Sequence, residues 1–126
     1  MISSSAVLEI NTNNLLHNYK YLASISKSSL AGATIKANAY GLGDVKVFNI
    51  LYKAGCKHFF VATFKEAVDI RKKYKRGFIY VLNGLNKNNI KNLIKENNII
   101  PIINSIENLK TIKKEIINIK KIINIG

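Results

Sequence analysis

The residues best suited to chemistry lie around Lys36, in the string Ile35-Lys36-Ala37-Asn38-Ala39-Tyr40-Gly41. Lys36 falls near the end of a predicted strand and just before a turn, which is where barrel enzymes carry their catalytic groups. Apolar neighbours such as Ile35 and Ala37 would keep water from the amine, and desolvation disfavours the charged ammonium. A neutral amine can form a Schiff base with an aldehyde. Position alone leaves a second interpretation open, because a lone lysine at a strand end is more often a solvated residue.

Short apolar segments alternate with amphipathic ones along the chain, and this alternation places the lysine. Strands are expected at residues 6–10, 31–37, 58–62, 78–82 and 99–103, with residues 121–125 as the start of another. Strands separated by helices predict parallel βαβ units with right-handed crossovers. A doubly wound sheet and part of a (β/α)8 barrel both satisfy this pattern. A full barrel takes about 250 residues, so a chain of 126 supplies about half of one.

The expected helices begin and end at local sequence signals. Asn11 or Thr12 caps the first helix and Asp44 the second, Thr63-Phe64-Lys65-Glu66 is a capping box, Asn86 begins the fourth, and Ser105 caps the last. A glycine-containing turn is expected at Tyr40-Gly41-Leu42-Gly43, and Gly55 and Gly77 end the second and third helices. Apolar residues at helical spacing are expected on the inward faces of the first, second and fourth helices: Leu15, Leu16, Tyr19, Leu22, Ala23, Val47, Phe48, Leu51, Ile90, Leu93 and Ile94. The third helix carries Ala67, Val68, Ile70, Arg71 and Tyr74, and the last helix runs through Leu109 and Ile112.

Other titratable residues are better explained by structure than by catalysis. His17 lies one position off the first helix's apolar stripe, which predicts a surface or boundary place, and His58 begins a strand. Asp44 and Glu66 are expected to cap helices. The single cysteine, Cys56, can form no internal disulfide and gives no thiolate metal site, so it is expected to be a small buried hydrophobe.

The chain carries a formal charge of +13, from 20 Lys and Arg against 7 Asp and Glu. The lysines are spread along the chain with no RNA-binding aromatic motif or zinc-finger spacing, so nucleic acid is not the expected partner. No apolar run approaches the ~20 residues of a membrane span. The first residues lack the charged and apolar regions of a signal peptide, which predicts a cytoplasmic protein.

The string Lys-Ala-Asn-Ala-Tyr-Gly, followed by x-Gly-Asp, closely resembles the cofactor-lysine motif of alanine racemases. The resemblance extends over nearly the whole chain. Further segments similar to the family's first strands and helices are Ala6-Val7-Leu8-Glu9-Ile10 with Leu15, His17 and Asn18, then Ala54-Gly55 with His58-Phe59-Phe60-Val61-Ala62-Thr63 and Glu66-Ala67, Ile79-Tyr80-Val81-Leu82 with Gly84, and Ile100-Pro101-Ile102-Ile103-Asn104-Ser105.

The resemblance implies a partial (β/α)8 TIM barrel over residues 1–126 that binds pyridoxal 5'-phosphate. Lys36 would bond the cofactor and act as one of two acid/base groups in the interconversion of L- and D-alanine, which supplies D-alanine for peptidoglycan. Tyr40 would contact the cofactor phosphate through its hydroxyl, and Leu82 would line the cofactor ring. The cofactor would act as the electron sink.

The chain departs from the family in two places. Leu42 stands where the family usually has histidine, and a leucine side chain cannot support Tyr40 by a hydrogen bond. The chain also stops at Ile123-Asn124-Ile125-Gly126, before the family's Asp-Thr-Gly-Met-x-Arg-x-Gly segment and its C-terminal β domain. The second base of racemisation belongs to that domain and reaches in from a partner subunit.

These departures leave several functional hypotheses. The first is an alanine racemase whose activity is impaired or absent in this fragment. The alternatives are a non-catalytic pyridoxal-phosphate-binding protein and the remnant of a split gene. Half a barrel leaves strand edges unpaired and apolar surface uncovered, so a homodimer or a complementing fragment is the expected partner, with alanine as the small-molecule substrate.

Overall fold

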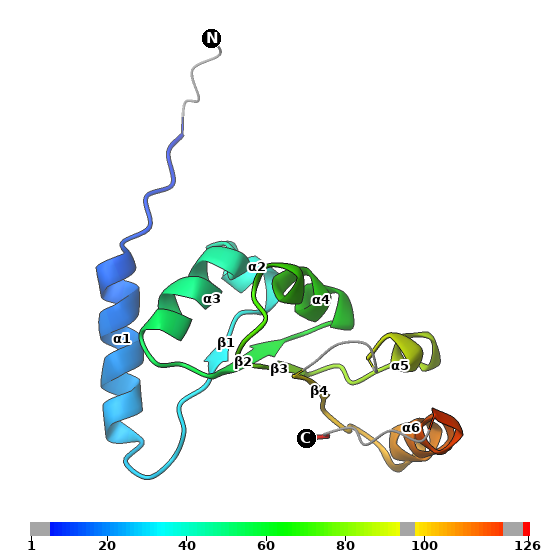
Figure 1. Ribbon diagram of the computed structural model, residues 1–126. Coiled ribbons are helices and arrows are strands. Elements are labelled where there is room, and N and C mark those ends of the chain that lie inside the picture. Colours follow the sequence, from blue (N-terminus) through cyan, green and yellow to red (C-terminus); the bar gives the residue numbers. More distant parts are fainter. Residues whose placement is uncertain (1–5, 94–97, 120–124) are drawn as a thin grey trace.

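The computed structural model describes residues 6–93, 98–119 and 125–126 and contains a four-stranded parallel sheet (Figure 1). The strands lie side by side in the order in which they occur along the chain. The register pairs Thr34 with Phe60, His58 with Phe78, and Ile79 with Ile99. The strands are β1 (Ala33–Thr34), β2 (His58–Val61), β3 (Phe78–Val81) and β4 (Ile99–Pro101).

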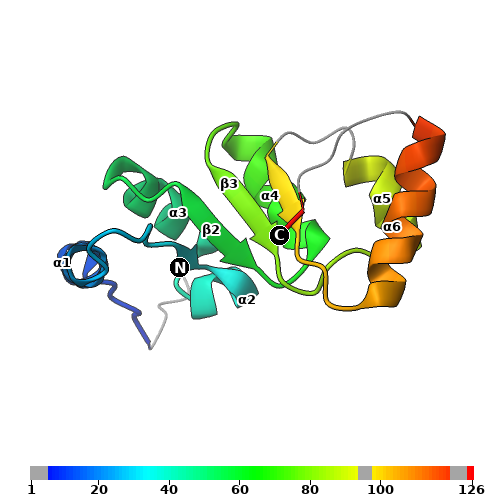
Figure 2. The same cartoon turned by 90° about the horizontal axis from the view of Figure 1, so that it is seen from below.

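The helices that pack on the sheet lie on one of its faces. Seen from below, β2 and β3 lie in front of α3 and α4, with α1 and α6 at opposite sides (Figure 2). A doubly wound sheet would carry helices on both faces and would not have its strands in chain order. The arrangement is that of a barrel wall. The helices are α1 (Thr12–Ile25), α2 (Lys36–Tyr40), α3 (Asp44–Lys53), α4 (Phe64–Lys73), α5 (Lys87–Leu93) and α6 (Ile106–Ile119).

The helix ends follow the expected signals closely. Asn11 Oδ1 accepts hydrogen bonds from the backbone of Asn13 and Asn14, and Ser105 Oγ accepts one from Asn108. Asp44 was expected to be the cap of α3, but it is the first helical residue, after Gly43. Its Oδ1 still accepts the N–H of Val45 at 2.6 Å, so it satisfies a free donor from inside the helix.

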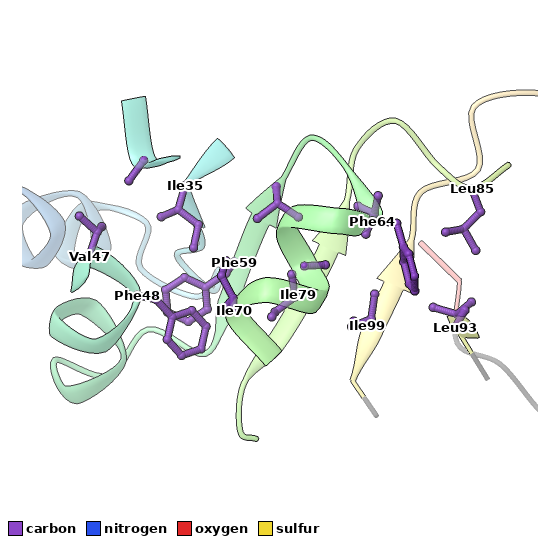
Figure 3. Packing of buried hydrophobic residues seen from close by; sticks show 14 of the residues in the cluster. Ile35, Val47, Phe48, Phe59, Phe64, Ile70, Ile79, Leu85, Leu93 and Ile99 are labelled. Atoms are coloured by element: carbon purple, nitrogen blue, oxygen red, sulfur yellow. The ribbon is translucent and has the colours of Figure 1, made fainter. Parts of the chain in front are cut away.

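The core lies between the sheet and the helices (Figure 3). Alternate strand residues point into it, and Phe59, Val61, Ile79 and Val81 are fully buried. The Phe48 ring of α3 packs against the Phe59 ring with centroids 4.1 Å apart and the ring planes tilted by 33°, and Cys56 is buried as expected. Val47, Phe48 and Leu51 of α3 are buried as expected, whereas α1 contributes only the partly buried Leu15, Leu16 and Tyr19.

One buried position in α4 is charged. Arg71 is 2% exposed, and its guanidinium donates to the carbonyl oxygens of Tyr74, Arg76, Gly77 and Asn98 at 2.9–3.1 Å. Five donors in a planar fork suit such a ring of acceptors. The side chain therefore joins the end of α4 to the entries of β3 and β4.

The opposite face of the sheet carries a partly exposed aromatic row. His58, Phe78, Tyr80 and Phe60 stack with centroids 4.8–5.9 Å apart, and His58 Nδ1 lies 3.0 Å from the Tyr80 hydroxyl oxygen. In a barrel, this face points to the interior.

Several expected strands are shorter than predicted or absent. Residues 6–10 form no strand, and Val7 and Leu8 are 90% and 73% exposed, so they have no sheet to pack on. The strand expected at residues 31–37 is only β1, because a turn begins at Lys36. Most of the strand expected at 121–125 and the Ile94 position lie outside the described residues. Gly126 nevertheless exchanges backbone hydrogen bonds with Pro101 and Ile103 beside β4.

Candidate functional site

Lys36 lies where β1 ends, at the carboxyl edge of the parallel sheet. The preceding residue, Ile35, is buried in the core, and its N–H donates to the carbonyl oxygen of Phe60 at 2.8 Å. Lys36 itself is half-buried. The ion pairs of the described residues join Lys65 and Lys72 to Asp69, so no described carboxylate neutralises Lys36. Lys36 thus lies at the sheet edge with no ionic partner in the described part of the chain.

The residues after Lys36 in the short element α2 form a left-handed turn. Ala37, Asn38, Ala39 and Tyr40 all have φ between 52° and 55°. This conformation costs roughly 1–2 kcal/mol for each residue that has a Cβ. Consecutive left-handed residues persist only where their surroundings impose them, and such strain concentrates at functional sites. The glycine turn expected at residues 40–43 therefore begins earlier than predicted.

Hydrogen bonds from both sides hold this turn. Gly43 N–H donates to the Asn38 carbonyl oxygen at 2.9 Å, and the N–H of Asp44 donates to Asn38 Oδ1 at 3.1 Å. On the other side, the Ala37 N–H donates to Glu66 Oε1 at 2.8 Å. Asn38 is the one residue of the four that tolerates this conformation readily, and its side chain also fixes the start of α3.

Tyr40 and Leu82 lie at the same carboxyl edge. Tyr40 ends the left-handed turn and is 64% exposed. Leu82 follows β3 and is half-buried, and its N–H donates to the Val61 carbonyl oxygen at 2.9 Å. Since β2 separates β1 from β3, Lys36 and Leu82 follow strands that are not direct neighbours in the sheet.

The remaining candidates have structural surroundings. His17 is exposed, and His58 stacks in the aromatic row at the other end of β2. Within residues 6–93, 98–119 and 125–126, no three His, Cys, Asp or Glu side chains gather as metal ligands. Cavities of about 250 and 140 Å³ lie at the amino edge of the sheet, lined by residues such as Tyr74 and Lys57, and Lys36 contacts neither.

The sequence signals missed the contact between Glu66 and Ala37. Glu66 was expected only to complete a capping box, which it does: its carboxylate accepts the Thr63 N–H at 2.9 Å, and Thr63 Oγ1 accepts the Glu66 N–H at 3.3 Å. The bond to Ala37 spans 29 residues. No local rule predicts it.

Comparison with known proteins identifies the family. The model of the alanine racemase N-terminal domain matches residues 10–125. The chain belongs to this family. Alanine racemase from Rickettsia akari is 41% identical over 112 residues, which are 88% of this chain and 31% of that protein. The chain therefore spans about a third of the length of the curated relatives that it matches.

Solved structures agree with the barrel fold of the alanine racemase N-terminal domain. An alanine racemase from Bartonella henselae, described with covalently bound pyridoxal phosphate, superposes with a TM-score of 0.84 at 31% identity, covering 92% of this chain and 32% of that one. A histidine racemase from Leuconostoc mesenteroides reaches 0.79 at 21% identity, covering 90% of this chain and 30% of that one, which shows a shared fold alone. No helix in the described part of the chain is long and apolar enough to cross a membrane.

Proposed function

We propose that this chain forms the part of an alanine racemase that bonds pyridoxal phosphate, with Lys36 as the bonding residue. The observation that carries the proposal is the place of Lys36 at the carboxyl edge of a barrel wall. Lys36 is half-buried there, has no ionic partner among the described residues, and is followed by a strained turn. Functional groups of barrel enzymes lie at this edge.

The residues present fit the cofactor. A primary amine matches the aldehyde, a phenol hydroxyl can donate to a phosphate oxygen, and an aliphatic side chain can pack against an aromatic ring. Lys36, Tyr40 and Leu82 supply these three groups at one edge. The relative from Bartonella henselae, with its covalently bound pyridoxal phosphate, supports the assignment.

Each residue has a separate task in the proposed mechanism. When bound, pyridoxal phosphate supplies an electron sink for negative charge at the substrate's Cα. The Lys36 amine accepts the proton from Cα on one face of the amino acid and returns it. The Tyr40 hydroxyl would hold the phosphate group by a hydrogen bond. Leu82 would pack against the ring and exclude water there.

The substrate and setting belong to the same proposal. We infer that the substrate is alanine. The D-alanine formed would be made in the cytoplasm and used for peptidoglycan. The partly exposed aromatic row on the face of the sheet opposite the helices is a surface that a second copy in a homodimer, or a complementing fragment, would cover. These 126 residues alone are expected to racemise alanine slowly, since the 112 of them that match the relative from Rickettsia akari cover 31% of that protein.

The test is covalent labelling. The chain is incubated with pyridoxal phosphate and reduced with borohydride, and the modified lysines are mapped by peptide mass spectrometry. Modification is expected to concentrate at Lys36 and to disappear in Lys36→Ala. Lys46→Ala is the matched control, because Lys46 is an exposed lysine on the neighbouring helix α3. Equal modification of Lys36 and Lys46 would refute the assignment, and rapid racemisation by the chain would refute the expected slow turnover.

A further inference from the structure

The carboxylate of Glu66 joins two segments that are distant in the sequence. Its Oε2 accepts the N–H groups of Ala62 and Thr63 at 2.8 and 2.9 Å, at the end of β2. Its Oε1 accepts the N–H of Ala37 at 2.8 Å, directly after Lys36. Capping of α4 explains only the bond to Thr63. The other two bonds make Glu66 a link between the ends of β1 and β2.

The link reaches the backbone at the residue where the left-handed turn begins. Ala37 has φ 52° and ψ 51°, and three further left-handed residues follow. A hydrogen bond from an N–H to a carboxylate is roughly twice as strong as one between neutral groups. Glu66 therefore holds the strained residue in place at its first N–H, while Asn38 holds the far side of the turn.

The charge state of Glu66 agrees with this arrangement. Burial by itself would raise the pKa of this carboxyl, but the N–H groups of Thr63, Ala37 and Ala62 outweigh burial and hold the pKa below its ordinary value. Glu66 forms no ion pair with Lys36. Its influence on the lysine thus runs through the backbone.

We propose that Glu66 is a positioning residue for Lys36: by binding the Ala37 N–H, it fixes the left-handed turn and so the direction in which Lys36 leaves the sheet edge. The inference rests on the proposed function, because it is the cofactor that requires a fixed lysine. It goes beyond helix capping, which would stabilise α4 wherever Lys36 pointed.

The test compares Glu66→Gln with Thr63→Ala in the same chain. A glutamine amide has one accepting oxygen, so it cannot serve Ala37 on one side and Ala62 and Thr63 on the other. Thr63→Ala removes the cap bond to the Glu66 N–H but leaves all three bonds to the carboxylate. Both variants weaken the start of α4, and only the first one releases Ala37.

Two measurements follow the turn and the lysine separately. Amide hydrogen exchange at Ala37, read by NMR, is expected to quicken by about tenfold or more in Glu66→Gln, the size expected for losing a bond to a charged group. It is expected to stay within about twofold of the parent in Thr63→Ala. Borohydride-trapped pyridoxal phosphate on Lys36 at limiting cofactor is expected to fall several-fold in Glu66→Gln alone.

The outcomes separate the two proposals. A parent chain that is not labelled at Lys36 refutes the proposed function. A labelled parent with both variants alike in exchange and in labelling refutes the positioning role alone. If Glu66→Gln does not fold, a pH titration of the parent chain followed by NMR tests the proposal instead. The amide resonances of Ala37, Ala62 and Thr63 are then expected to shift together as Glu66 titrates. An Ala37 resonance that stays still while the other two move overturns the proposal.

Discussion

Replacing Ala37 by glycine tests the left-handed turn directly. Ala37 is exposed and has φ 52°, so the substitution removes no buried contact and leaves its N–H on Glu66. Relief of the Cβ clash is worth about 1–2 kcal/mol, and the greater freedom of glycine in the unfolded chain costs about 0.5–1 kcal/mol. The net expectation is a gain in the free energy of unfolding of about 0.5–1 kcal/mol, or roughly 2–5 °C in Tm.

The control is the same substitution in a right-handed helix. Ala23 lies in α1, and Ala23→Gly is expected to lower the free energy of unfolding by about 1 kcal/mol. Urea unfolding followed by far-ultraviolet circular dichroism measures both variants against the parent. The diagnostic result is the opposite sign of the two changes. A loss of stability in Ala37→Gly comparable to that in Ala23→Gly would show that residue 37 is not left-handed.

Three further predictions concern the charged and buried groups. Arg71→Lys is expected to lower the free energy of unfolding, measured in urea, by roughly 3 kcal/mol. One ammonium cannot donate to four carbonyl oxygens, and each hydrogen bond to a charged group contributes about 1.5–3 kcal/mol. An unchanged urea midpoint would contradict this. The hydrogen bonds to the Glu66 carboxylate hold the pKa of this group in the folded chain below its ordinary 4.5. Their contribution to the free energy of unfolding is therefore full above pH 4.5 and is lost as the pH falls through the lowered pKa of the folded state. Glu66→Gln is expected to abolish this part of the acid dependence. Burial raises the pKa of the Cys56 thiol above its ordinary 9.0. Alkylation of Cys56 at pH 8 is therefore expected to be slow in the folded chain and fast in denaturant. Equal alkylation rates in the two conditions would place Cys56 at the surface.

The sequence was sufficient for the features that depend on local rules. The alternation of apolar strands with amphipathic helices placed Lys36 at a strand end, and Thr63 with Glu66 marked the start of α4. Residues such as Phe59 and Ile79, which lie in short apolar runs, are buried as such runs predict. Periodicity could not choose between a barrel and a doubly wound sheet, and the one-sided helix layer decided it.

The features that the sequence did not reveal depend on contacts between distant residues. Alanine and tyrosine prefer right-handed conformations, so three of the four residues from Ala37 to Tyr40 gave no sign of a left-handed turn. The Glu66 bond to Ala37 joins two consecutive βα units. The sequence placed Arg71 on the third expected helix but gave no sign of its burial, because its four carbonyl partners come from the ends of segments that only the fold brings together. The strand expected at residues 6–10 lacked a neighbouring strand, which no local pattern reports.

The agreement between strand order and chain order has a kinetic consequence. Every pairing in the sheet joins strands that are consecutive in the chain, so closing each one requires only a single βα loop. Topologies with such local pairings fold faster than those that must first bring distant segments together. A chain emerging from the ribosome can therefore dock each new strand on the one before it, with α4 covering β2 and β3 as soon as both have been synthesised.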